Sequence, residues 1–399
     1  MTLASGLATR DQAGGAHALA RYRAEFPIFR DGDRVYLNTC SLGALGERTR
    51  RKLAEFLDLW QSRGAAAWYD VWGAALSELR ARYAAVVGAT PAGEQEIALA
   101  PSISVALSAF AEALDYGRRP KVVTTALDFP TVAYQWLAKA GRGIELVIVE
   151  SPDGVTVPVD AIARAVDDRT ALVATSHVYF TSGAIQDIRA VAAAAHARGA
   201  LCLIDAYQSV GQIAVDVRAS GVDALTAGGL KWLLGGPGIV FLYVRAELAR
   251  RLRPTIAGWF GHRDQFAFEP RHLAFHDDTR RFELGTPALA AIYAQLGGLE
   301  YIEEIGVPAI REVTAALTED LITRARAAGF APKVAADPAA RSAIVMLPVP
   351  DPAAAVRHLA AAGIIADARP GHVRLSPFFY NVQDDHVRAT ERLATHAAH

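Results

Sequence analysis

The sequence predicts an α/β protein in which a mostly parallel sheet is covered by helices and is followed by a smaller α+β part. The chain has 399 residues, 52% apolar and 21% charged, which is enough for a large core and too apolar for a disordered protein. Seven short apolar runs alternate with helix-like stretches, as in parallel sheets. Several of these runs are continuously apolar, which is typical of strands buried on both faces.

The spacing of apolar residues places the individual elements of the predicted sheet. Arg50–Trp60 and Leu76–Val87 predict helices, because apolar residues recur there at intervals of three and four. Asp187–Arg198 predicts another helix, which begins with an acid and ends before Gly199. The predicted strands are Glu96–Ala100, Lys121–Thr125, Glu145–Val149, Thr170–Thr175, Ala200–Ile204, Ala224–Ala227 and Ile239–Val244.

The pattern changes around Glu283–Gly297, after the last of these strands. Pro287–Glu304 and Val307–Gly329 predict long helices, and Ser342–Pro348 and His372–Leu375 predict further strands. Residues 1–20 are small and polar and predict a loose arm. We therefore expect an N-terminal arm at 1–32, a large domain at 33–282, and a linker helix with a small C-terminal α+β domain at 283–399.

Charge and cysteine content exclude several classes of protein. With 41 basic and 42 acidic residues, the protein has no global electrostatic reason to bind nucleic acid. Two cysteines, Cys40 and Cys202, are too few for a disulfide framework or a cysteine-rich zinc site. We expect neither a signal peptide nor a membrane span, because no suitable apolar segment is present, and we expect a cytoplasmic protein.

Two charged residues stand in apolar surroundings. Asp205 ends the apolar run Leu201–Ile204, at the strand edge where open α/β sheets place their ligands, although a solvated loop acid or helix cap would look the same. Lys231 is the one cation in the glycine-rich stretch 228–238. Burying a lysine is costly unless it is paired, neutral or covalently used, and the alternative is a side chain that reaches the surface. The flanking glycines would let a bulky cofactor approach the backbone.

Three further segments carry groups suited to an anion or a ring. Ser102-Ile103-Ser104 begins a helix, where free N–H groups bind phosphate, although an ordinary serine cap is equally compatible. Phe129 directly follows a strand and could stack on a ring or simply close the core. Arg374 lies in an apolar strand and needs an anionic partner, either internal or external.

One cofactor explains these features together. Pyridoxal 5′-phosphate (PLP) requires a lysine to form an aldimine, an acid to keep the pyridine nitrogen protonated, a phosphate site and a ring to stack on. Lys231, Asp205, the helix that begins at Ile103, and Phe129 supply these contacts.

The order of these residues resembles the fold-type-I PLP enzymes of the class V aminotransferase group, and most closely the kynureninases and cysteine desulfurase-like proteins. The resemblance runs from about Tyr36 to Asn381. Beyond Lys231, it is carried by the segments 176–183 (SHVYFTSG), 205–208 (DAYQ), 258–262 (GWFGH), 281–287 (RFELGTP) and 373–381 (VRLSPFFYN).

The resemblance implies a role for each matching residue. Asp205 would pair with the pyridine nitrogen, Gln208 would bond the phenolic oxygen, and Arg374 would grip the substrate α-carboxylate. Trp259 and Thr286 would reach the phosphate of a neighbouring subunit, which implies a homodimer with shared active sites. The implied cofactor-binding residues are Ile103, Ser104, Phe129, Tyr179, Asp205, Gln208, Lys231, Trp259 and Thr286, and the implied catalytic residues are Lys231, Asp205 and Arg374.

Several positions depart from the pattern of these relatives. Tyr179 stands where relatives often have Asn facing the cofactor oxygen. Gly228 and Leu230 replace polar residues that relatives often use beside the lysine, so the phosphate would lose contacts there. Thr286 matches the desulfurase-type Gly-Thr-Pro rather than the Asn of kynureninases, which weakens kynurenine as a substrate.

We therefore expect a PLP enzyme whose small-molecule substrate is an amino acid, and a lyase of kynureninase-like type that cleaves a C–C or C–S bond in the substrate side chain. The alternatives are a class V aminotransferase, an amino-acid epimerase, or a PLP-binding protein without turnover. Desulfurases pass sulfur through a cysteine of the C-terminal half, and residues 203–399 contain none, which favours direct cleavage.

Overall fold

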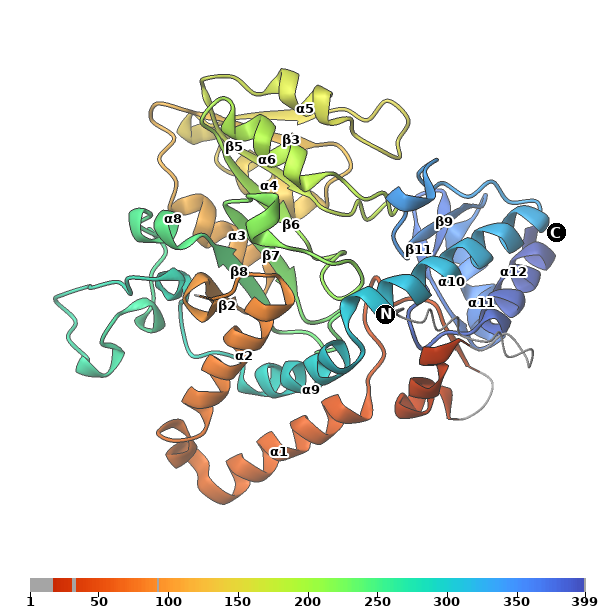
Figure 1. Cartoon of the computed structure of the whole chain (residues 1–399), viewed down its shortest axis with the longest axis horizontal. Helices are drawn as coiled ribbons and strands as arrows, with labels where there is room; N and C mark the ends of the chain where they lie inside the picture. Colours follow the sequence, from red (N-terminus) through yellow and green to blue (C-terminus); the bar gives the residue numbers. More distant parts are fainter. Residues whose placement is uncertain (1–16, 31–33, 92, 398–399) are drawn as a thin grey trace, which may run out of the picture.

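The computed structural model describes residues 17–30, 34–91 and 93–397. Its centre is a seven-stranded sheet in the order β2-β8-β7-β6-β5-β3-β4 (Figure 1). Strands β3 to β7 run parallel, and β8 is antiparallel to both of its neighbours, which confirms the predicted fold class. The strands are β2 (Ile97–Ala100), β3 (Lys121–Thr125), β4 (Glu145–Val149), β5 (Thr170–Ser176), β6 (Leu201–Asp205), β7 (Ala224–Gly228) and β8 (Val240–Val244).

Helices cover both faces of this sheet, because side chains of successive strand residues point to opposite faces. In β6, Cys202 and Ile204 pack into one hydrophobic cluster with helices α2, α6 and α9, whereas Leu203 packs into another with α3, α4 and α8. The continuous apolar runs of the sequence thus serve two cores. The helices of this part are α1 (Glu47–Arg63), α2 (Trp72–Val86), α3 (Ile103–Glu112), α4 (Pro130–Leu137), α5 (Val159–Ala165), α6 (Ile188–His196), α7 (Val217–Ser220), α8 (Ala246–Arg251) and α9 (Leu289–Ile305).

The C-terminal part forms a second core beside the sheet (Figure 1). Its three-stranded antiparallel sheet has the order β11-β12-β9, and the short strand β1 pairs with β10. Helix α10 runs from the large sheet into this part. The elements are β1 (Val35–Tyr36), β9 (Val345–Pro348), β10 (Ile364–Ile365), β11 (Asp367–Arg369), β12 (His372–Leu375), α10 (Val307–Ala327), α11 (Pro352–Ala361) and α12 (Gln383–Ala397). The domain boundaries expected at 33 and 283 stay a prediction.

The N-terminal segment differs from the predicted loose arm where it is described. Residues 1–16 lie outside the described residues, whereas Ala18–Glu25 forms a 3-10 helix. Tyr22 donates a hydrogen bond to Glu304 at 2.8 Å, and Arg23 pairs with Asp385 at the same distance. These contacts bind the segment to α9 and α12. None of the helices in the described part of the protein is long and apolar enough to cross a membrane.

A buried ion pair ties the edge of the large sheet to the segment that leads into α9. Glu283 accepts hydrogen bonds from Arg80 of α2 at 2.8 Å and from the N–H of Leu99 in β2 at 3.0 Å. Arg80 and Glu283 are 6% and 5% exposed, so neither can exchange its partner for water. Removing one partner would leave the other charge buried and uncompensated.

We expect the change Glu283→Ala to lower the free energy of unfolding by about 3–5 kcal/mol, because it strands the Arg80 guanidinium and the N–H of Leu99. Urea denaturation followed by circular dichroism measures the loss. The matched control is Asp277→Ala, which removes the partner of Arg263 in an exposed pair and should leave the stability unchanged. An equal loss in both variants would contradict the assigned role of the buried pair.

Candidate functional site

A cavity of about 200 Å³ lies at the carboxyl edge of the parallel strands. Parallel strands bring their carboxyl ends to one edge, so residues far apart in sequence meet there. Ser176 and Asp205 end β5 and β6, and Lys231 follows β7. The lining residues are Ile103, Phe129, Ser176, Val178, Phe180, Asp205, Tyr207, Gln208, Leu230 and Lys231.

Lys231 lies in the loop between β7 and β8, with its amino group inside the cavity. Its Nζ atom is 4.5 Å from the centroid of the Tyr207 ring. Burial lowers the pKa of Lys231 to about 8; nearby Cys40 and Asp205 oppose this shift, and the charge of Arg374 adds to it. About a tenth of the amine is therefore neutral at pH 7, far more than in an ordinary lysine, and a nucleophile or a general base must be neutral.

The glycines on either side of Lys231 are required for a reason other than the expected approach of a cofactor to the backbone. A Cβ atom on Gly229 or Gly235 would lie 1.9 or 2.2 Å from the Oε1 atom of Gln295 in α9. Gln295 donates a hydrogen bond to the carbonyl of Leu233 at 3.1 Å. These two glycines therefore let α9 pack closely against the lysine loop, and they do not open the backbone to a cofactor.

Asp205 is buried and has one oxygen available. Its Oδ1 accepts a hydrogen bond from the N–H of Tyr207 at 2.9 Å, and no described residue donates to Oδ2. Burial raises the pKa of Asp205 to about 6, which the charge of Lys231 partly offsets and that of Asp128 increases. A cationic partner would lower the pKa of Asp205 again. A protonated pyridine nitrogen would supply both the charge and the missing hydrogen bond.

Gln208 is held by hydrogen bonds at both ends of its amide. Its Nε2 donates to the carbonyl of Cys40 at 3.0 Å, and its Oε1 accepts from the indole of Trp232 at 2.9 Å. The second hydrogen of the amide nitrogen stays available for the expected contact with a phenolic oxygen.

Phe129 stands at the start of α4, on the wall of the cavity. Its ring is 43% exposed and meets Phe180 edge-on at 5.2 Å, so one face is open to a stacked ring. The preceding residue, Asp128, is buried and accepts hydrogen bonds from the N–H groups of Thr125 at 2.8 Å and Ser176 at 2.6 Å. Asp128 thus ties β3 to β5 and positions Phe129. It was not among the predicted site residues, although an acid directly after an apolar strand was a signal for it.

The N-terminus of α3 reaches the same cavity through Ile103. Ser102 caps the helix by accepting a hydrogen bond from the N–H of Val105 at 3.3 Å. The Ser104 hydroxyl pairs with that of Thr131 at 3.1 Å, and no described acceptor takes the N–H groups of Ile103 and Ser104. These two N–H groups fit an anion such as phosphate.

Arg374 already has an internal anionic partner, the first of the two alternatives left open by the sequence. Its Nη2 atom donates to Asp367 at 2.6 Å and to Ser41 at 2.8 Å, and its Nη1 donates to the carbonyl of Phe180 at 3.1 Å. The Nε atom is buried without a partner, and Arg374 is not among the residues that line the Lys231 cavity. Asp367 lies directly opposite Arg374 in the β11–β12 pair, a relation that a single sequence cannot reveal.

Four expected cofactor-binding residues are not among those that line this cavity: Ser104, which follows Ile103 in α3, and Tyr179, Trp259 and Thr286. Tyr179 is buried and accepts a hydrogen bond from Gln186 at 2.9 Å. Its neighbours Val178 and Phe180 line the cavity and Tyr179 itself does not, so its expected contact with the cofactor stays a prediction. Thr286 lines a separate cavity of about 380 Å³.

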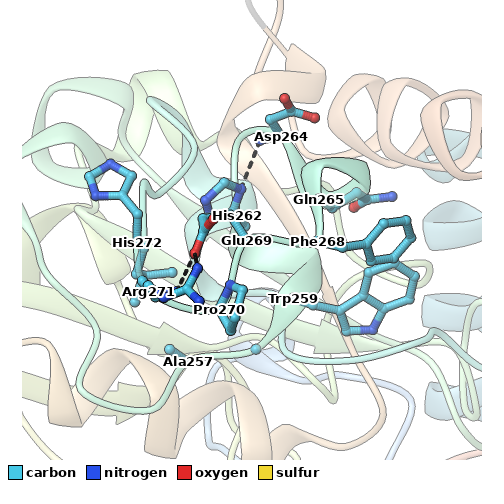
Figure 2. Close-up of a pocket in the computed structure, with 12 residues that line it drawn as sticks. Ala257, Trp259, His262, Asp264, Gln265, Phe268, Glu269, Pro270, Arg271 and His272 are labelled. Atoms are coloured by element: carbon cyan, nitrogen blue, oxygen red, sulfur yellow. Dashed lines mark hydrogen bonds and ion pairs between the residues drawn. The ribbon is translucent and has the colours of Figure 1, made fainter.

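Trp259 lines a third hollow, of about 480 Å³, within the loop 257–273 (Figure 2). The Trp259 ring is 41% exposed and stacks on Phe268 with centroids 6.4 Å apart. Trp259 and Thr286 therefore do not line the Lys231 cavity of their own subunit.

This protein is similar to aminotransferases, kynureninases and cysteine desulfurases. The aminotransferase class-V family model matches residues 53–390. An uncharacterized aminotransferase of Bacillus subtilis is 33% identical over 386 residues, covering 96% of this protein and 99% of the relative. A kynureninase of Deinococcus radiodurans is 33% identical over 329 residues, covering 79% and 76%. An apo cysteine desulfurase from Thermococcus onnurineus has the same fold, with a TM-score of 0.86 at 21% identity, covering 97% and 100% of the two proteins.

The lowered pKa of Lys231 predicts the pH dependence of PLP attachment, because only a neutral amine attacks an aldehyde. The rate of attachment to the apoprotein should rise about tenfold per pH unit below about pH 8 and level off above it. Stopped-flow absorbance between pH 6 and 10 measures this rate, with Lys231→Ala as the control that loses attachment. A rate that still rises tenfold between pH 9 and 10 would indicate an ordinary lysine and contradict the prediction.

Proposed function

The protein belongs to the class V aminotransferase family, and from this premise we propose that it cleaves a C–C or C–S bond in the side chain of an amino acid, in a kynureninase-like reaction. It is a PLP-dependent enzyme. The observation that carries the PLP chemistry is the pairing, in one cavity, of a lysine whose pKa is about 8 with a buried acid that has a free oxygen, and the kynureninase relative supports side-chain cleavage. Bound PLP withdraws electrons from the α-carbon of the substrate.

The residues of the cavity divide the remaining work. Lys231 would hold the cofactor and would move a proton at the α-carbon of the substrate, because burial lowers the pKa of its amine toward neutral pH. Asp205 keeps a proton on the pyridine nitrogen through its free oxygen. The N–H groups of Ile103 and Ser104 bind the phosphate, and Phe129 packs on the ring. Gln208 keeps the phenolic oxygen in place.

Two observations favour side-chain cleavage without a sulfur relay. Cys202 is fully buried within β6, and burial raises the pKa of its thiol well above the ordinary range, so it stays an inert thiol. Cys40, on the loop before α1, is also fully buried. Separately, the kynureninase relative supports a lyase. The second candidate is an aminotransferase, which the name of the Bacillus subtilis relative favours.

A homodimer with shared active sites is also proposed. Trp259 and Thr286 line hollows other than the Lys231 cavity of their own subunit. Trp259, Phe266 and Phe268 form an exposed aromatic cluster on the loop 257–273. Figure 2 shows the Trp259 and Phe268 rings of this cluster. A second subunit that covers this cluster would bring these residues to its own phosphate site. The cytoplasmic location expected from the sequence stays a prediction.

Arg374 is proposed to bind the substrate α-carboxylate through its unpartnered Nε and a neighbouring Nη atom. The change Arg374→Lys should raise the L-alanine concentration that gives a half-maximal change of the cofactor absorbance by about 10- to 100-fold, because an ammonium cannot bind a carboxylate as a fork. The absorbance without amino acid should stay as in the wild type, which serves as the control for cofactor binding. An unchanged half-maximal concentration would contradict this role.

An absorbance screen of the holoenzyme against a panel of amino acids, with product analysis of every responder, tests the reaction class. We expect a responder to lose part of its side chain, and the double variant Cys40→Ser/Cys202→Ala to keep its turnover. A 2-oxo acid as the product would show an aminotransferase instead. A persulfide on either cysteine, with loss of turnover in the double variant, would show desulfurase chemistry.

A further inference from the structure

The ring of Tyr207 and the missing side chain of Gly228 occupy the same space. Tyr207 lies two residues after Asp205 and lines the cavity with Lys231. A Cβ atom on Gly228 would lie 2.2 Å from Cε2 of Tyr207 and 2.4 Å from its hydroxyl oxygen. The backbone of Gly228 does not need a glycine, since its φ is not positive. The glycine at this position is therefore required by the tyrosine, which stands where a side chain of residue 228 would begin.

The hydroxyl of Tyr207 is a hydrogen-bond donor without a partner. None of the residues described in the structure accepts from it, although most of the side chain is enclosed by protein and by the cavity. Burial and the nearby charge of Asp205 raise the pKa of this phenol, so it keeps its proton. Its oxygen is not among the fully buried atoms without a partner, so the hydroxyl is open to the cavity, where a ligand could accept its hydrogen bond.

The surroundings of this hydroxyl suit an anion. Tyr207 and Ile103 pack against the same hydrophobic cluster, which includes Ala106 and Leu107 of α3, and both line the cavity. Ile103 and Ser104 offer free N–H groups at the start of that helix. Lys231 lies 4.5 Å from the centre of the tyrosine ring. The phosphate is the most highly charged group of PLP and suits the free N–H groups of α3, so we take the phosphate as the group that the Tyr207 hydroxyl would meet.

We propose that the Tyr207 hydroxyl donates a hydrogen bond to the phosphate of PLP and replaces the donor that Gly228 cannot supply. The inference rests on PLP attachment at Lys231. The inference explains how the protein can have Gly228 near Lys231 and still keep a phosphate contact. The donor is then Tyr207, in the turn after β6, instead of a side chain at the end of β7.

The test compares the affinity of the apoprotein for PLP with its affinity for pyridoxal, which lacks the phosphate. In Tyr207→Phe the ring is kept and only the hydroxyl is lost, so the dissociation constant of PLP should rise about tenfold and that of pyridoxal should stay unchanged. Tyr134→Phe, which removes an exposed phenol on α4, is the matched control. Equal weakening of both ligands, or no weakening of either, would overturn the proposal.

A second set of variants tests the exchange between the two positions. Tyr207→Ala should weaken PLP binding at least as much as Tyr207→Phe, and it also frees the space beside residue 228. The double variant Tyr207→Ala/Gly228→Ser places a hydroxyl there from β7 and should recover most of the lost PLP affinity. Gly228→Ser alone should weaken binding, because its Cβ atom meets the Tyr207 ring. A double variant no better than Tyr207→Ala would contradict the exchange.

Borohydride reduction of the wild-type holoenzyme, followed by peptide mapping, separates this inference from the proposed function. A pyridoxyl group on Lys231 together with unchanged PLP affinity in Tyr207→Phe would overturn the role of Tyr207 alone. A pyridoxyl group on another lysine would overturn both.

Discussion

The site depends on the loop that joins β7 to β8, because this loop places the Lys231 amine at the edge of the sheet. Three residues that are far from this loop in the sequence hold it. Gly43 donates its N–H to the carbonyl of Leu230 at 2.8 Å, Thr49 of α1 donates to Leu234 at 2.9 Å, and Gln295 of α9 donates to Leu233 at 3.1 Å. A backbone anchored at three carbonyls so close together has little freedom, so the amine is held in position before any ligand binds.

The two ionisable groups of the cavity, Lys231 and Asp205, lack partners that would offset the cost of their burial. A bound ligand would supply these partners. Burial lowers the pKa of Lys231 to about 8 and raises that of Asp205 to about 6, so both groups are less charged than in water. Covalent use of the amine and a cationic partner for the acid relieve both costs. On the proposed phosphate side, the Tyr207 hydroxyl and the first N–H groups of α3 offer hydrogen-bond donors without a partner among the described residues.

The C-terminal part contributes the guanidinium of Arg374, whose charge is partly neutralised by Asp367 before any ligand binds. Arg374 shares Asp367 with Arg369, whose Nη1 lies 2.7 Å from the other carboxylate oxygen. This arrangement fixes the guanidinium against Ser41 and Phe180, at the meeting point of the two parts of the protein. A carboxylate that binds there meets an oriented donor whose charge is reduced, which favours geometric fit over simple charge attraction.

The sequence by itself determined the fold class, the seven strands to within one residue of their ends, and the placement of Lys231, Asp205 and Phe129 in one site. It could do so because burial on both faces imposes continuous apolar runs, and because parallel strands deliver their last residues to one edge. Only the tertiary structure decided which way Tyr179 points, that Asp367 faces Arg374, and that the glycines around Lys231 accommodate Gln295 and Tyr207. These contacts join side chains that are distant in sequence. Because the sequence around one residue does not show which distant residue packs against it, such contacts cannot be predicted from the local pattern.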